Sequence, residues 1–356
     1  MKNQFILLML LVTSITVTNA QNIWTVNNQP SFNADFTNLQ VAVDSASAGD
    51  IIMLHGSSTS YGSLVIRKRI VIIGPGYLLG QNDAPNTQAN PLPASISNLT
   101  FDSDPSGDID ASGSLVTGLT ITNVYSSAAS QTPINYTVQR CYIEFTRPGS
   151  YVTALFKENL LYYSPDNSYA TLDLDGINNT TFENNIIIRG NGEDIVHTNN
   201  QNTGTFKNNT FVSIGANDPE VLIEGDGMSF INNLFLGDTT ITVINQYGIG
   251  SVQNNMSNTT TFEGIASNIT DANADNLVIG WSNPEGLSLD NRFSTKANAP
   301  SIGAGLNGEN IGAFTNTSPY ILSGIPFVPN IYALDAPDFG TTGSGITVNI
   351  KAKANN

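Results

Sequence analysis

A short motif, Phe-x-Asn-Asn, recurs in the middle of this chain at an interval of 24 residues. It occurs at 182–185, 206–209 and 230–233. Related segments lie at 252–255 and 156–159, and weaker copies precede them at 138–141, 116–119 and 96–99. A fixed period of about two dozen residues is typical of a solenoid or a propeller, in which each repeat is one structural unit.

The residue two positions after each motif is apolar in every copy except the last, where it is Ser257. The apolar residues are Phe101, Ile121, Ile143, Leu161, Ile187, Phe211 and Phe235. The repeats contain short β-branched or aromatic runs separated by Asn and Gly, and no repeat contains a run long enough for a helix. A propeller blade needs about 40 residues or more, so the period favours one turn of a parallel β-helix.

The motif asparagines have a structural role in such a fold. If successive turns stack, one asparagine per turn lies above the next at the strand spacing of about 4.8 Å. Stacked amides satisfy one another's hydrogen bonds at a buried corner, where a charge would be costly. We therefore predict a structural ladder formed by Asn159, Asn185, Asn209, Asn233 and Asn255. We also expect Lys157, Glu183 and Lys207 to alternate in sign on consecutive turns.

The first twenty residues have the pattern of a signal peptide. Lys2 precedes the apolar run 5–12, and small residues flank a cleavage point after Ala20. The apolar run is shorter than the roughly 20 residues that a membrane span requires. We predict a signal peptide at 1–20, and a secreted, extracellular or periplasmic protein without a membrane span.

Composition excludes several classes of function. The net charge of −16 opposes nucleic-acid binding, because phosphate would be repelled. The single cysteine, Cys141, excludes an internal disulfide framework and a thiol-ligated metal site. Asparagine is abundant instead, with 45 residues in 356.

A short helix is expected at the start of the mature chain. Phe36, Leu39, Val43 and Ala46 recur at helical spacing after Asn33, a candidate N-cap. This helix would cover the open apolar end of the solenoid.

The segment that follows this helix resembles the opening of a known superfamily. A Gly-Asp-Ile turn at 49–51 and an alternating strand at 63–74 are similar to the first coil of the pectin-lyase-like right-handed parallel β-helix proteins. The Asn-Asn turns and the segment 299–314 resemble that superfamily's later coils. The resemblance covers roughly residues 35 to 315 and implies an all-β, right-handed parallel β-helix with a short N-terminal capping helix and a C-terminal β tail. Handedness comes from the resemblance alone.

The resemblance sets the expected organisation of the chain. We expect a β-helix domain with its N-terminal cap at 21–315, followed by a proline-rich linker and a C-terminal strand tail at 316–356. The end of the tail, 345–353, alternates with period two and reads as a strand. It would lie against the solenoid flank or cover the C-terminal edge.

One patch suggests chemistry, on a further strand of each turn. Aligning Leu174, Val196, Ile223 and Ile244 as the inward residues places a polar row outside, formed by Asp175, His197, Glu224 and Asn245. In this superfamily, sites lie on such a sheet face, so Asp175, His197 and Glu224 are candidate catalytic residues for glycoside hydrolysis. Candidate substrate-binding residues are Asp173, Arg189, Asp226 and Asn245. The carboxylates also suit Ca²⁺, although an ordinary solvated strand face is the favoured explanation of the row.

Two functions from different classes follow. The first is a non-catalytic scaffold that binds a polysaccharide or a cell-surface glycan, or that serves in surface adhesion. The second is a carbohydrate-active enzyme, either a polysaccharide lyase or a glycoside hydrolase. The chain lacks the Arg-x-Pro-x-x-Arg pattern of pectate lyases and the Gly-His-Gly of polygalacturonases, so the sequence favours the scaffold.

Overall fold

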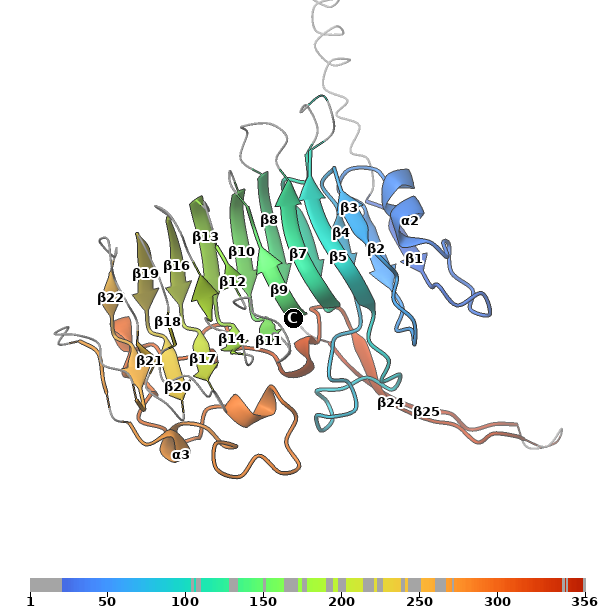
Figure 1. Cartoon of the computed structure of the whole chain (residues 1–356). Helices are drawn as coiled ribbons and strands as arrows, with labels where there is room; N and C mark the ends of the chain where they lie inside the picture. The colour runs from blue at the N-terminus through green and yellow to red at the C-terminus, as the bar shows by residue number, and fades with distance from the viewer. Residues whose placement is uncertain are drawn as a thin grey trace, which may run out of the picture.

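The protein is a single parallel β-solenoid in which successive turns stack side by side (Figure 1). The computed structural model describes residues 21–103, 106, 110–127, 134–149, 152–162, 172–174, 178–189, 195–197, 203–213, 221–222, 227–237, 241–242, 251–259, 267–270, 272–340, 343 and 345–354. The predicted all-β parallel β-helix is confirmed.

One strand from each turn joins a long sheet, called here the first sheet. Its neighbouring strands are all parallel. In spatial order they are β1 (Ile23–Val26), β2 (Ile51–Leu54), β4 (Val71–Ile73), β6 (Ser114–Thr117), β8 (Ile134–Gln139), β10 (Val152–Lys157), β13 (Asn178–Glu183), β16 (Thr203–Lys207), β19 (Met228–Ile231) and β22 (Val252–Gln253).

A second parallel sheet follows the first one across a sharp corner. Its strands, in chain order, are β3 (Leu64–Ile66), β5 (Ser95–Asp102), β7 (Thr120–Ser127), β9 (Tyr142–Arg147), β11 (Leu160–Tyr162), β14 (Ile186–Ile188), β17 (Thr210–Ser213), β20 (Leu234–Gly237) and β23 (Met256–Ser257). Four strands of two residues each are grouped here as the third side. β12 (Leu172–Asp173) and β15 (Val196–His197) join the second sheet through β9, while β18 (Val221–Leu222) and β21 (Ile241–Thr242) form a two-stranded sheet of their own.

The core of the later turns contains a column of stacked aromatic rings. Phe156, Phe182, Phe206 and Phe230 occupy equivalent positions on neighbouring strands of the first sheet and are 0% exposed. Their ring centroids lie 5.0, 4.8 and 5.0 Å apart along the column, with nearly parallel planes. Each stacked pair adds about 0.5–1.5 kcal/mol beyond the burial of its surface. The phenylalanines of the repeat therefore define the core, as their spacing predicts.

The two asparagines of each motif have different structural roles at the corner. The first adopts a left-handed backbone, with φ of 57° at Asn184, 56° at Asn208 and 58° at Asn232, a conformation that asparagine tolerates better than most side chains. The second is buried, and its Oδ1 accepts hydrogen bonds from both the backbone N and the Nδ2 of its counterpart in the preceding turn. These N–H···Oδ1 distances are 2.9–3.1 Å along Asn159, Asn185, Asn209, Asn233 and Asn255.

The weakest expected copy of the repeat is wrong. Residues 96–99 lie in β5 of the second sheet, where Ile96 is level with Ile121. The residue of the first sheet that precedes Val116 in its column is Ile72. The long connection at 74–94 interrupts the period at this point, so counting backwards in steps of about two dozen residues selects the wrong strand.

A short helix closes the N-terminal end of the solenoid, as expected. Helix α2 (Leu39–Ser45) buries Leu39, Ala42 and Val43 in the same core as the first strands. Its N-cap is Asn38 rather than Asn33, because the Asn38 side chain accepts a hydrogen bond from Val41 N at 3.0 Å. Both positions hold asparagine before an apolar pattern, so composition alone does not separate them.

After the last turn, the chain passes through short helices and returns along the corner toward the first turns. The helices are α3 (Ala274–Leu277) and the single-turn 3₁₀ segments η1 (Asn291–Phe293), η2 (Leu306–Gly308) and η3 (Leu322–Gly324). The return contacts run in reverse order of the turns: Gly312 N to Asn232 O, Ala313 N to Thr210 Oγ1, Ser318 Oγ to Glu158 Oε1, Arg140 Nη1 to Ile325 O, and Asn330 Nδ2 to Thr87 O. The return segment therefore lies on the flank and covers the corner.

The C-terminal tail forms an antiparallel hairpin beyond this segment. Strands β24 (Asn330–Asp335) and β25 (Asn349–Lys353) pair with each other and extend away from the solenoid (Figure 1). The expected strand at 345–353 is shorter than its alternating pattern, and its partner is β24.

Candidate functional site

The expected acidic row falls on the third side, of which the structure describes Asp173 and the backbone of His197. The register pairs Leu172 with Val196, and Asp173 with His197. The expected alignment of Leu174 with Val196 is therefore shifted by two residues, and the neighbour of His197 in the preceding turn is Asp173 instead of Asp175. Leu172 and Leu174 are both 0% exposed, so the alternating pattern alone permits either register.

Asp173 is held by a base from the turn before. Its Oδ2 lies 3.4 Å from Arg147 Nε, and the Asp173 side chain is 16% exposed while that of Arg147 is 53% exposed. An exposed pair of this kind contributes little to stability. The arrangement places a carboxylate and a guanidinium on one outward strand face, beside the backbone of His197.

Most of the other candidates on this side lie outside the described residues. These are Asp175, Glu224, Asp226 and Asn245, together with the side chain of His197. Arg189 is described, and only 4% of it is exposed. A buried arginine of this kind does not fit a residue that contacts a polysaccharide from solvent.

A second surface, which the sequence reasoning missed, is the outward face of the first sheet. The residue before each core position points outward, since side chains alternate along a strand. The resulting row runs across neighbouring strands in register: Leu115, Thr137, Leu155, Thr181, Thr205 and Ser229. A signal for it was present, because a hydroxyl residue precedes the phenylalanine at 182, 206 and 230.

A parallel row on the same face carries charge. Gln139, Lys157, Glu183 and Lys207 are level with one another on consecutive strands. The predicted alternation of sign at Lys157, Glu183 and Lys207 is confirmed. Alternating neighbours attract each other and favour this register over a slipped one.

These rows border an open groove of about 610 Å³ in the middle of the first sheet. Hydroxyl and amide side chains at Asn135, Thr137, Thr153, Asn179 and Thr181 line it together with the apolar Leu115 and Leu155, and Gln139 and Lys157 lie at one border. None of the described residues that line the groove carries a carboxylate. Such a surface donates and accepts hydrogen bonds over several turns but lacks the acid pair that glycoside hydrolysis uses.

Two buried ionisable groups are Tyr136 in the first sheet and Cys141 at the corner. Burial raises the pKa of Tyr136, whose hydroxyl bonds to Ser126, well above its ordinary value. Burial also raises the pKa of the Cys141 thiol to about 12. Both groups therefore stay protonated near neutral pH, and neither is a base or a nucleophile there.

Neither a metal-binding cluster nor a membrane-spanning helix is present among the described residues. Across the described parts of the chain, no three His, Cys, Asp or Glu side chains gather closely enough to hold a metal ion. Within the same residues, no helix has the length and apolar character needed to cross a membrane.

Comparisons with known proteins bear on the architecture. No protein-family model matches the chain, and no curated protein matches its sequence. Among solved structures, the chain is similar to pectate lyase Pel9A, with a TM-score of 0.50 and 13% sequence identity. The match covers 83% of this chain and 96% of that protein. At this identity the likeness concerns the path of the backbone, and on that basis the protein has the pectin-lyase-like right-handed parallel β-helix fold.

Proposed function

We propose that the protein is a secreted, non-catalytic scaffold that binds a neutral polysaccharide or cell-surface glycan along the outward face of its first sheet. The observation that carries this proposal is the groove on that face, lined by hydroxyl and amide side chains from several consecutive turns. These groups match the donors and acceptors of sugar hydroxyls. The β-helix fold is consistent with a carbohydrate-related role.

Charge favours a neutral ligand over an acidic one. The whole chain carries a net charge of −16, which repels a polyanion. Lys157 borders the groove, but its Nζ lies 3.6 Å from the buried carboxylate of Glu158. Its charge is thus partly compensated within the protein.

Repetition supports an extended ligand. Neighbouring strands lie about 4.8 Å apart, so equivalent side chains recur at that interval along the solenoid. This interval is similar to the length of one sugar residue in an extended polysaccharide. A linear chain laid along the solenoid axis would meet the same type of hydrogen-bonding group at each turn.

The test removes the hydroxyls while leaving the shape intact. A Thr137→Val/Thr181→Val variant should bind immobilised neutral polysaccharides about five- to 150-fold more weakly, because each of the two lost hydrogen bonds contributes about 0.5–1.5 kcal/mol. The matched control is Thr100→Val/Thr120→Val, which makes the same change at half-buried positions of the second sheet. Equal binding by both variants would contradict the proposal.

The alternative is a polysaccharide lyase or glycoside hydrolase centred on the third side. The observation in its favour is the register that places Asp173 beside His197, with Arg147 close to the carboxylate. Its catalytic groups would be Asp175, His197 and Glu224, with Asp173, Asp226 and Asn245 binding substrate or Ca²⁺. New reducing or unsaturated chain ends, formed with or without Ca²⁺ and lost in Asp175→Ala/Glu224→Ala, would establish this enzyme and overturn the scaffold.

Export is a separate part of the proposal. Residues 1–20 have the features of a signal peptide. N-terminal sequencing of the protein recovered outside the cell or from the periplasm should start at Gln21. A mature protein that begins at Met1 would contradict it.

A further inference from the structure

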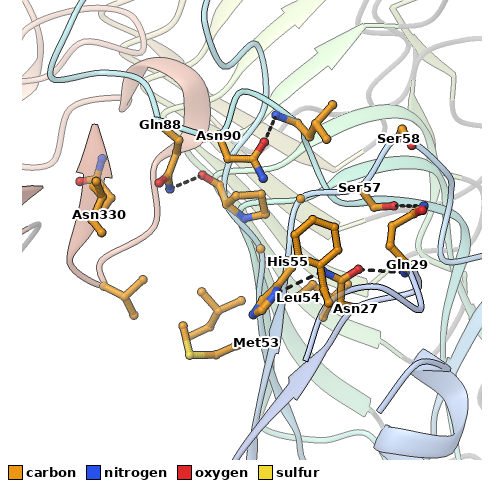
Figure 2. A pocket seen from close by; sticks show the side chains of 18 of the residues that line it. Asn27, Gln29, Met53, Leu54, His55, Ser57, Ser58, Gln88, Asn90 and Asn330 are labelled. Carbon is orange, nitrogen blue, oxygen red and sulfur yellow. Dashed lines mark hydrogen bonds between the residues drawn. The ribbon is translucent and has the colours of Figure 1, made fainter. Parts of the chain in front are cut away.

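A second cavity, of about 610 Å³, lies at the N-terminal end of the first sheet (Figure 2). We call it the end pocket. It is formed by three parts of the chain that are far apart in sequence: the first turns at 27–32 and 53–58, the connection at 73–92, and the return segment at 328–331.

Hydrogen bonds hold the three walls of the end pocket together. Ser57 N donates to Pro93 O at 2.9 Å, which joins the first turns to the connection. Ala89 N donates to Ile331 O at 2.8 Å, which joins the connection to the return segment. The cavity is therefore formed before any ligand arrives, and binding does not have to order it.

The imidazole of His55 has a defined orientation in this pocket. Asn27 is 2% exposed, and its Oδ1 accepts from Gln29 N at 2.9 Å, so its Nδ2 faces Nδ1 of His55 at 3.3 Å. Because Nδ2 can only donate, Nδ1 accepts, and the proton of the neutral ring lies on Nε2. His55 thus has an N–H left to donate.

Two amides on the opposite wall supply the complementary groups. Gln88 Nε2 donates to Pro75 O at 2.9 Å, which leaves Oε1 to accept. Asn90 Oδ1 accepts from Leu92 N at 3.1 Å, which leaves Nδ2 to donate. Figure 2 shows His55, Gln88 and Asn90 around the same opening.

The remaining lining combines apolar side chains with the polar but uncharged Gln29, Ser57, Ser58 and Asn330. Phe32 and Leu92 are 60% and 40% exposed, and both border the pocket. None of the described residues that line it is Asp, Glu, Lys or Arg. Fixed donors and acceptors beside an apolar surface, without charge, match the edges and faces of a neutral sugar ring.

The end pocket and the groove lie along the same sheet, but Ile73 and Thr117 between them are only 3% and 0% exposed. The accessible path therefore runs over the half-buried Val71 and Leu115, two residues earlier on the same strands. Met53 and Ile73, which line the end pocket, are level with Thr117, and Thr117 is level with Gln139 and Lys157 at the border of the groove. Four strand steps separate Met53 from Lys157, a distance of about 19 Å at the usual strand spacing.

We propose that the end pocket binds the terminal sugar of the same neutral glycan whose following residues lie along the first sheet. This inference rests on the proposed function and adds a position to it: the chain end is recognised by His55, Gln88 and Asn90. An extended ligand of about four or five residues would reach from the end pocket to the groove.

The test measures how affinity depends on ligand length. Neutral β-1,4-linked oligosaccharides of two, four and six residues are titrated by calorimetry into the wild-type protein and into His55→Phe/Asn90→Leu, which removes two donors and keeps their bulk. The wild type should bind six residues at least about tenfold more tightly than two, and the variant should lose most of that gain. His55→Gln, which restores an N–H donor, should recover part of it. An unchanged urea midpoint in each variant establishes that the fold is intact.

Different results separate this inference from the proposed function. If Thr137→Val/Thr181→Val weakens binding but His55→Phe/Asn90→Leu matches the wild type at every length, the end pocket is not used and this inference alone is wrong. If no neutral oligosaccharide or polysaccharide binds, both proposals are wrong. If only the end-pocket variant weakens binding, the shared ligand is contradicted together with the groove.

Discussion

The first sheet and the third side are built from the same turns, yet they differ in regularity. The first sheet runs through ten strands within the described residues, and its corner carries an unbroken series of amide hydrogen bonds from Asn159 to Asn255. Among the described residues, the strands of the third side have two residues each, and they pair as β12–β15 and β18–β21, with one contact of β12 with β9.

This difference indicates that the interactions at the corner fix the period of the repeat. At the corner, a shift of one residue would bury the wrong side chain and break four hydrogen bonds per asparagine, so the period is held. On the third side, the described strands have two residues each, and each pair is level over two residues. The surface with constant spacing is therefore the better platform for a repetitive ligand.

The largest expected contrast concerns thiol reactivity. Burial raises the pKa of Cys141, at the corner, to about 12, and its backbone N donates to Asn159 Oδ1 at 2.9 Å. A thiol placed on the third side, in Cys141→Ala/Asp173→Cys, should have an ordinary pKa near 8.5. At pH 8 we expect a disulfide reagent to label the third-side thiol about a thousandfold faster, since only the thiolate reacts. Similar rates would show that the corner opens as readily as the third side.

The next largest effect is expected within one corner. Asn209→Ala removes a 0% exposed amide that bonds to Phe182 O and to Asn185 and Asn233. It should lower the free energy of unfolding by about 3 kcal/mol, because several buried polar groups lose their partners. The measurement is urea denaturation.

The matched control for this variant is its neighbour in the chain. Asn208→Gly keeps the left-handed backbone, with φ of 56° in the native protein, and loses one 3.3 Å contact with Glu309. It should cost about 1 kcal/mol or less, since glycine adopts this conformation without strain. Equal costs at 208 and 209 would mean that the ladder is not what stabilises the corner.

Ion pairs offer a third comparison of the two regions. At the corner, Arg140 Nε lies 2.6 Å from Glu158 Oε2, and the glutamate side chain is 2% exposed. Glu158→Gln should cost about 2–3 kcal/mol, because it leaves a mostly buried guanidinium without its counter-charge. Asp173→Asn on the third side should cost less than about 1 kcal/mol, because its partner Arg147 is 53% exposed. The measurement is thermal unfolding of the two variants, and a larger loss of stability in Asp173→Asn than in Glu158→Gln would contradict this expectation.

The smallest effect is expected on the outward face of the first sheet. Glu183→Lys places three like charges on consecutive strands, between Lys157 and Lys207. The cost should be about 0.5 kcal/mol in dilute buffer and should shrink in high salt, where exposed charges are screened. Glu183→Gln serves as the control for loss of attraction without repulsion. A cost that persists in molar salt would point to packing instead of charge.

Much of the fold was predictable because each turn carries the same residue types in the same packing environment. The core position is indicated by Phe182, Phe206 and Phe230, and the corner is indicated by the asparagines that follow them. Both patterns recur because equivalent residues pack in the same way in each turn. The prediction failed at 96–99, where the connection at 74–94 breaks the period. It also failed in the register beside His197, where Leu172 and Leu174 are equally suited to the core.

The candidate site was less predictable than the fold. The acidic row was sought among charged residues, whereas the groove is lined by Thr137, Thr181 and similar neutral side chains that look ordinary in a chain rich in threonine and asparagine. Arg189 was chosen for its closeness in sequence, and burial at 4% exposure removes it from the surface. The end pocket had no signal at all, because His55, Asn90 and Asn330 belong to segments with no shared pattern.

The period, the stacked core and the amide corner follow from the amino-acid sequence, because they depend on neighbouring turns that carry the same residues. The register of the third side, the return of residues 312–330 along the corner, and the joining of three distant segments into the end pocket are features of the folded chain. Those features depend on contacts made once, between unlike segments. A contact between two unlike segments has no repeating sequence pattern, so its partners are identified only in the folded chain.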